Sequence, residues 1–193
     1  MKSKTSFSLR RSRSVLFAAL ALFGATAAFG RTLPQDLDDP VVAVHGSAIE
    51  TLWQGGAIGI ADREARDLFV GLEARLRPSW HGIRPWAGLT LVDSGAWFSG
   101  AGLIYDIELT PRMRLTLGSG PFYYADGNRG WDLGYDLEFY SFAELTWQWR
   151  RDLRLGFRVG HLSNAGLGRR NPGTETLGLV VAIPLDRLVA GNL

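Results

Sequence analysis

The stretch LRLGFRVGHLS, residues 153–163, decides the fold of this chain. Its odd-numbered positions up to 159 are apolar, and its even-numbered positions up to 160 are arginine or glycine. Side chains alternate between the two faces of a β-strand, so the pattern predicts a strand with one apolar and one polar face. His161 and Ser163 continue the odd-numbered series and are therefore expected on the apolar face.

Seven more segments are strand candidates, although the first of them is ambiguous in its alternation. The eight predicted strands are roughly 41–53, 66–77, 82–92, 96–109, 111–124, 133–149, 151–163 and 174–185. Charged side chains share the inner face of several strands, among them Asp106, Glu108, Asp136, Glu138, Glu144, Arg154 and Arg158. With 24 glycines, seven tryptophans and 11% aromatic residues, this pattern predicts an all-β fold: an eight-stranded antiparallel transmembrane β-barrel of the outer membrane. Side chains fill the interior of so small a barrel, so no channel is expected.

The N-terminus has the features of a secretory signal peptide over 1–30: a basic start, a short apolar run and small residues before the cleavage site. Residues 31–40 read as a periplasmic lead-in, 41–185 as the barrel and 186–193 as a C-terminal tail. Cleavage after Gly30 removes five basic residues and leaves 16 basic against 19 acidic side chains, a net charge of −3. The basic balance of the whole chain therefore gives no support to nucleic-acid binding. The chain has no cysteine, so packing and hydrogen bonds alone hold the fold.

Loop lengths predict the orientation of the barrel. The second, fourth and sixth connections are tight, whereas the first (54–65), the fifth (125–132) and the seventh (164–173) are longer. Periplasmic turns are short and outer loops are long in bacterial barrels. His161 and Ser163, together with Glu175 at the start of the last strand, are therefore expected near the outer rim, facing lipid.

Serine, histidine and glutamate on one face form a potential hydrolytic triad. The imidazole of His161 can take the hydroxyl proton as Ser163 attacks an ester carbonyl, and Glu175 can orient the imidazole and stabilise its charged form. The negative intermediate needs hydrogen-bond donors, for which the side-chain amide of Asn164 and the backbone N–H of Gly166 are candidates. The pattern predicts an ester hydrolase and says little about the acyl donor.

The C-terminal part resembles a known family in its motifs. These are Phe157-Arg158, His161-x-Ser163-Asn164-Ala165-Gly166-Leu167, Asn171-x-Gly173, Glu175 and Ile183-Pro184-Leu185, and they are similar to those of the outer-membrane lipid A 3-O-deacylases. The resemblance implies hydrolysis of the ester at position 3 of lipid A, with release of a 3-hydroxy fatty acid and no metal or cofactor. It implies His161, Ser163 and Glu175 as catalytic residues and Asn164 and Gly166 as oxyanion positions. The tail after residue 185 departs from the pattern of barrels that end on their last strand.

The role of two arginines and the oligomeric state are left open by the sequence. Arg169 and Arg170 lie in the predicted seventh loop, where they either pair with lipid A phosphates or form a solvated basic loop. The three histidines are too dispersed to make a metal site. The sequence does not decide whether the barrel forms a homodimer.

Three alternatives to a lipid A deacylase stay open. A non-enzymatic small barrel would act in adhesion or membrane stabilisation, and would leave the shared face of the three polar residues unexplained. A soluble barrel binding a ligand inside would need an apolar interior, against the inward charges. An outer-membrane esterase acting on another lipid would use the same three residues.

Overall fold

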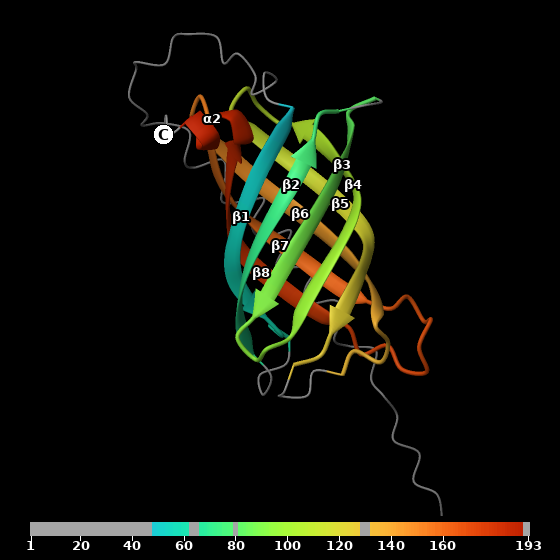
Figure 1. The fold of residues 1–193 in the computed structure, drawn as a ribbon. Helices are drawn as coiled ribbons and strands as arrows, with labels where there is room; N and C mark the ends of the chain where they lie inside the picture. The colour runs from blue at the N-terminus through green and yellow to red at the C-terminus, as the bar shows by residue number, and fades with distance from the viewer. Residues whose placement is uncertain (1–47, 62–65, 79–80, 128–131, 191–193) are drawn as a thin grey trace, which may run out of the picture. The chain divides into compact units, whose positions relative to one another are not determined.

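The computed structural model describes residues 48–61, 66–78, 81–127 and 132–190. Within them each strand pairs antiparallel with the next, and the first pairs with the last, so the sheet closes into a barrel (Figure 1). The strands are β1 (Ile49–Ile58), β2 (Asp67–Leu76), β3 (Ile83–Val92), β4 (Trp97–Glu108), β5 (Met113–Ala125), β6 (Leu137–Arg150), β7 (Leu153–Ser163) and β8 (Thr174–Pro184). The predicted closed eight-stranded antiparallel barrel is confirmed.

The first strand differs from its predicted bounds of 41–53. The strand β1 continues through residues 54–58, which the sequence assigned to a loop, and residues 41–47 lie outside the described part of the chain. The strands approach closely here, since a Cβ on Gly56 would lie 2.1 Å from the carbonyl oxygen of Leu177 on β8. Glycine is therefore required by packing between β1 and β8, and Gln54 points into the barrel, where it is 7% exposed.

The alternation of side chains is confirmed along the wall. On β2, Leu68 and Val70 are 66% and 62% exposed, whereas Phe69 between them is 4% exposed. On β8, Leu179 is exposed and Val180 is buried. The outer wall is therefore apolar, and the inner face carries charged side chains that the sequence placed there, among them Glu138, Glu144, Arg154 and Arg158. The prediction is wrong for Asp136, which is exposed because β6 begins only at Leu137, and Glu108 is 49% exposed at the turn end of β4.

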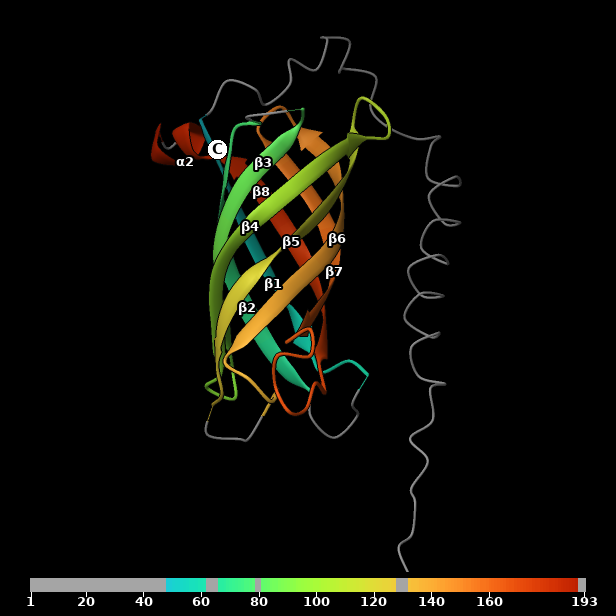
Figure 2. The same cartoon turned by 90° about the vertical axis from the view of Figure 1, so that its right-hand side faces the viewer.

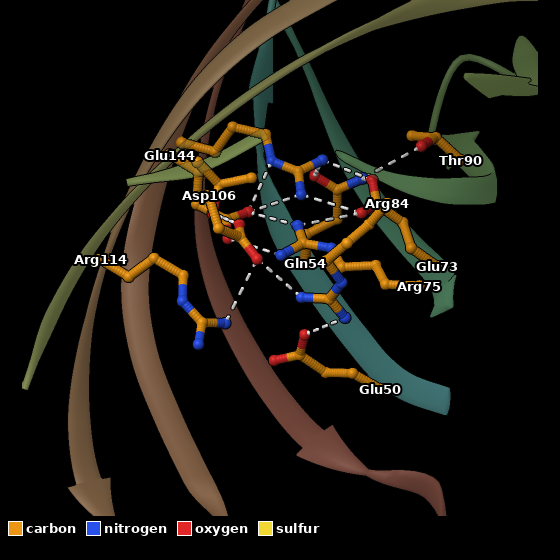
Figure 3. A network of polar contacts seen from close by, with 11 residues as sticks. Glu50, Gln54, Glu73, Arg75, Arg84, Thr90, Asp106, Arg114 and Glu144 are labelled. Carbon is orange, nitrogen blue, oxygen red and sulfur yellow. Dashed lines mark hydrogen bonds and ion pairs between the residues drawn. The ribbon is translucent and has the colours of Figure 1, made fainter. Parts of the chain in front are cut away.

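A charged layer crosses the barrel interior and consists of Glu73, Arg75, Glu144 and Arg158 (Figure 3). Arg75 binds Glu144 through two hydrogen bonds of 2.7 and 2.9 Å. Arg158 donates to Glu144 at 2.6 Å and to Glu73 at 2.9 Å. The four side chains are almost completely buried, so two positive charges balance two negative charges in a region without bulk water.

Other side chains fill the rest of the interior. A second charged group lies on β1, β3, β4 and β5. Arg84 on β3 binds Glu50 on β1 at 2.8 Å and Asp106 on β4 at 2.9 Å, and Arg114 on β5 lies 3.6 Å from Asp106. Aromatic rings pack together with centroids 5.2 to 6.3 Å apart, and this cluster consists of Trp86, Phe98, Phe122, Tyr140 and Phe142. Such packing is what an eight-stranded barrel requires.

The two ends of the barrel differ in their connections (Figures 1 and 2). The turn end has the links 77–82, 109–112 and 151–152, together with the helix α2 (Leu185–Ala190), which contacts β1 and β8. The loop end has the connections 59–66, 93–96, 126–136 and 164–173. The predicted tail 186–193 thus begins within α2, and 191–193 are not described. No helix among the described residues is long and apolar enough to cross a membrane.

The charged layer generates a prediction about stability. Arg158→Gln leaves Glu73 and Glu144 with one arginine between them, so we expect the free energy of unfolding to fall by about 3–5 kcal/mol. Guanidinium unfolding of the purified protein, followed by tryptophan fluorescence, measures the change. The matched control is Arg150→Gln at the exposed end of β6, for which a change within about 0.5 kcal/mol is expected. Equal effects of the two substitutions would contradict the assigned role of the layer.

Candidate functional site

His161 and Glu175 face each other across the β7–β8 hairpin at the loop end of the barrel. They are direct cross-strand partners, and the distance from His161 Nδ1 to Glu175 Oε1 is 3.8 Å. This distance suits an ion pair and is longer than a hydrogen bond. The side chains are 50% and 26% exposed, so both lie on the outer wall and not in the lumen. The carboxylate faces one nitrogen of the imidazole and leaves the other, Nε2, for a second partner.

Ser163 is the last residue of β7 and lies two positions from His161. The neighbours Leu162 and Asn164 are fully buried at 0% exposure, whereas His161 and Ser163 are accessible. On the adjacent strand β6, Ser163 is paired in register with Phe139. The three residues predicted to be catalytic are therefore brought to one patch of the outer wall. Such a patch has the groups needed to pass a hydroxyl proton to an imidazole beside a carboxylate.

Gly173, directly before β8, lies against the imidazole ring of His161. A Cβ at this position would lie 2.9 Å from His161 Cε1, closer than real contacts allow, and a tight 3.2 Å from Nε2. Its φ of 62° is also in the left-handed region, which favours glycine. The backbone of the loop thus limits where the ring can lie. In the sequence Gly173 stands out only as part of the motif Asn171-x-Gly173. Its contact with His161 could not be predicted, because it depends on how the 164–173 loop folds back against β7.

The loop after Ser163 begins with a tight turn over residues 164–167. The N–H of Leu167 donates to the carbonyl of Asn164 at 2.9 Å, and the two central residues, Ala165 and Gly166, have φ values of 53° and 84°. Two successive left-handed residues define a type I′ turn, which glycine adopts freely and alanine does not. A left-handed alanine costs about 1–3 kcal/mol, and such strain is typical of functional sites.

The predicted oxyanion donors are engaged within this loop. The side-chain amide of Asn164 points inward and donates to the carbonyls of Leu133 at 3.1 Å and Arg170 at 2.7 Å. Its Oδ1 accepts the N–H of Gly166 at 3.0 Å, and its own N–H donates to Asn171 Oδ1 at 3.0 Å. Asn164 therefore ties the seventh loop to the fifth. In this arrangement neither predicted donor is directed at a group beside Ser163, so these bonds must change for either donor to act as the sequence predicts.

The two arginines of the loop have different surroundings. Arg170 forms an exposed ion pair with Asp132 of the 126–136 loop. Arg169 is exposed next to it. Asp132 also borders a hollow of about 420 Å³ on the outer surface, which is lined by Tyr123, Asp132, Gly134, Tyr135, Asp136 and Leu137. Both arginines are thus exposed, and the guanidinium of Arg170 is paired with a carboxylate.

The architecture defines the class of protein to which this chain belongs. In comparisons with solved structures, the crystal structure of the outer membrane enzyme PagL has a TM-score of 0.54 and 22% identity, covering 70% of this chain and 99% of that chain. The crystal structure of Neisserial surface protein A (NspA) has a TM-score of 0.56 and 12% identity, covering 72% and 97%. The chain has the fold of these small outer-membrane β-barrels.

The family follows from the sequence itself. A family model described as lipid A 3-O-deacylase (PagL) matches residues 70–184, which is more than half of the chain. The protein therefore belongs to the lipid A 3-O-deacylase family, and the predicted resemblance is confirmed. No curated protein matches the chain.

The contact between Gly173 and His161 can be tested by adding a methyl group. In Gly173→Ala, the new Cβ displaces the imidazole from its place near Ser163 and Glu175, so we expect ester hydrolysis to fall about tenfold or more while the barrel stays folded. The Cε1–H resonance of His161 in a proton NMR spectrum reports the displacement directly.

The matched control is Gly82→Ala at the turn end of the barrel. Gly82 has a comparable φ of 83°, and its Cβ would lie 3.3 Å from the ring of Tyr105, far from His161. This variant carries the same backbone strain without the contact, so it should keep the activity and the His161 resonance. Equal losses in both variants would attribute the effect to backbone strain alone.

Proposed function

We propose that this protein hydrolyses the ester-linked 3-hydroxyacyl chain at position 3 of lipid A, in the outer leaflet of a Gram-negative outer membrane. Membership in the lipid A 3-O-deacylase family supports the reaction and its substrate. The observation that carries the proposal is the register of β7 and β8, which sets His161 opposite Glu175 with Ser163 on the same outward patch. Ester hydrolysis needs a nucleophile, a base and a group that orients the base, and this patch contains all three.

In the proposed mechanism Ser163 is the nucleophile. Its Oγ bonds to the ester carbonyl carbon while its proton passes to Nε2 of His161, and Glu175 on the Nδ1 side stabilises the imidazolium. The bond from the carbonyl carbon to the sugar oxygen then breaks, and His161 returns the proton to that oxygen. A water molecule, deprotonated by His161, then bonds to the carbonyl carbon of the acyl group. The bond from that carbon to Ser163 Oγ breaks, His161 returns the proton to Oγ, and the 3-hydroxy acid is released. The 3.8 Å separation of His161 and Glu175 is expected to shorten when substrate is bound.

The tetrahedral intermediate carries a negative charge that requires donors. We assign this role to Gly166 and Asn164, as the family motif suggests, with a rearrangement of the 164–167 turn. The N–H of Gly166 donates to one acceptor, the buried Asn164 Oδ1, and Gly166 itself is exposed. The amide of Asn164 has two carbonyl partners, so its exchange costs more. Gly166 is therefore the better candidate for direct contact, and Asn164 holds the turn that presents it.

The apolar outer wall supports a position within the membrane. Exposed leucine, valine and aromatic side chains on alternate positions are what a lipid-facing barrel surface requires. With the loop end outward, the candidate site lies at the level of the outer leaflet, and substrate reaches it by lateral diffusion. We assign Arg169 to a lipid A phosphate, and Arg170 to the same role after it exchanges Asp132 for the phosphate.

Mass spectrometry of lipid A tests the proposed function. Gram-negative cells that express the wild-type protein should lose one 3-hydroxyacyl chain from lipid A, and cells that express Ser163→Ala should not, because the nucleophile is absent. His161→Ala should behave as Ser163→Ala does. Each variant must be shown to be folded in the outer membrane by its heat-modifiable migration on a gel.

The matched control is Ser99→Ala, which removes a hydroxyl from the outer wall on β4, in register with Tyr123 and away from the hairpin. Its lipid A should be deacylated as in the wild type. Full activity of folded Ser163→Ala protein would overturn the mechanism. Unchanged lipid A with folded wild-type protein would overturn the substrate assignment.

A further inference from the structure

Two serines on the outer wall form a hydrogen-bonded pair that the sequence did not single out. Ser119 on β5 and Ser141 on β6 are both exposed, and their Oγ atoms are 2.8 Å apart. The two residues are direct cross-strand partners. We call them the hydroxyl pair. Each is a single serine in an alternating strand, so only the pairing of the strands brings them together.

The hydroxyl pair lies in one row with two of the candidate catalytic residues. Ser141 is paired in register with His161, and His161 with Glu175. The row across β5, β6, β7 and β8 is therefore polar throughout, from Ser119 to Glu175. The next outward-facing row toward the turn end is apolar throughout and consists of Leu117, Ala143, Val159 and Leu177. On β7 and β8 the polar row thus lies at the boundary between the apolar wall and the loop end, whereas on β5 and β6 exposed Tyr123 and Leu137 lie beyond it.

The polar row is oblique to the barrel. Ser119 lies six residues from the loop end of its strand at Ala125, and Ser141 lies four residues from Leu137. His161 lies two residues from the end of β7, and Glu175 lies one residue from the start of β8. The hydroxyl pair is therefore farther from the loop end than His161 and Glu175. On a barrel whose loop end faces outward, it lies on the side of the acyl chains.

The chemistry of the hydroxyl pair suits a hydroxylated ligand. The bond between Ser119 and Ser141 uses one of their two hydroxyl protons, so the pair keeps a second proton and acceptor lone pairs. A plain hydrocarbon chain offers no partner for these groups, and leaving them without one in an apolar medium is unfavourable. A chain with its own hydroxyl offers both a donor and an acceptor.

The distance from Ser163, the proposed nucleophile, to the hydroxyl pair also agrees with an acyl chain that carries a hydroxyl on its third carbon. Ser141 is the diagonal neighbour of Ser163, because Ser163 is paired with Phe139, two residues away. Diagonal neighbours on one face are about 7–8 Å apart. In an acyl group bound to Ser163, three bonds of about 1.5 Å lead from the carbonyl carbon to the oxygen on the third carbon. A hydrogen bond of about 2.8 Å from that oxygen then spans the remaining gap to Ser141.

We infer that Ser119 and Ser141 bind the 3-hydroxyl group of the acyl chain and make the enzyme prefer hydroxylated esters. Ser163 attacks the carbonyl while the hydroxyl pair holds the chain two carbons farther along, which fixes the carbonyl relative to His161. The inference rests on the proposed deacylation by Ser163 and adds the feature of the acyl chain that is recognised.

The test compares two substrates with the purified protein in detergent micelles. Both are glucosamine-based lipid A analogues, and the ester at position 3 carries either a 3-hydroxytetradecanoyl or a tetradecanoyl chain. For the wild type we expect kcat/KM to be about three- to tenfold higher with the hydroxylated ester, as one neutral hydrogen bond allows. In the Ser119→Ala/Ser141→Ala variant this ratio should fall to about one, through loss of activity on the hydroxylated ester.

Two further variants serve as controls. Ser99→Ala, elsewhere on the outer wall, should keep the wild-type ratio, and Ser141→Thr should also keep it because the hydroxyl is retained. Hydrolysis of both esters with a ratio that the double substitution does not change would overturn the inference alone. Loss of hydrolysis of both esters in folded Ser141→Ala protein would make Ser141 part of the proton-transfer machinery and would also overturn it. No hydrolysis of either ester by the wild type would overturn the proposed function together with the inference.

Discussion

The charged layer inside the barrel is the constraint on which the outer wall depends. Arg158 bonds to Glu144 on the neighbouring strand and reaches across the lumen to Glu73 on β2, so it joins opposite sides of the sheet. Separating these charges would leave a buried ion without a partner, which is strongly unfavourable. Arg158 must therefore face inward. Because side chains alternate along β7, His161, three residues later, must face outward.

Register converts this orientation into a site. A slip of one residue between β7 and its neighbours would turn every side chain of the strand to the opposite face. Bonds from Arg158 to two strands oppose such a slip, and the pairing of β7 with both β6 and β8 aligns His161 with Ser141 on one side and Glu175 on the other. Interior electrostatics and exterior chemistry are thus two consequences of the same pairing.

Much of this could be predicted from the sequence, because alternation with period two is a local property. It located seven of the eight strands to within a few residues and placed Arg154 and Arg158 inside. It failed at β1, whose residues 54–58 it assigned to a loop and where close packing against β8 requires Gly56. It also could not reveal the hydroxyl pair or the inward bonds of Asn164, since both depend on which strands and loops become neighbours.

The proposed site lies on the outer wall of a filled barrel, where the described strands do not surround a substrate as an internal cavity would. Geometry must then come from the sheet itself, whose cross-strand neighbours are held about 5 Å apart by backbone hydrogen bonds. His161 and Glu175 are positioned in this way, and the turn after Ser163 is closed by the bond from the Leu167 N–H to the Asn164 carbonyl. Selectivity among acyl chains is limited for a related reason, because an apolar wall binds different hydrocarbon chains with similar free energy. Discrimination among acyl chains therefore has to arise where a polar side chain interrupts that wall, and in the described part of β5 and β6 the bonded serines beside the site are such an interruption.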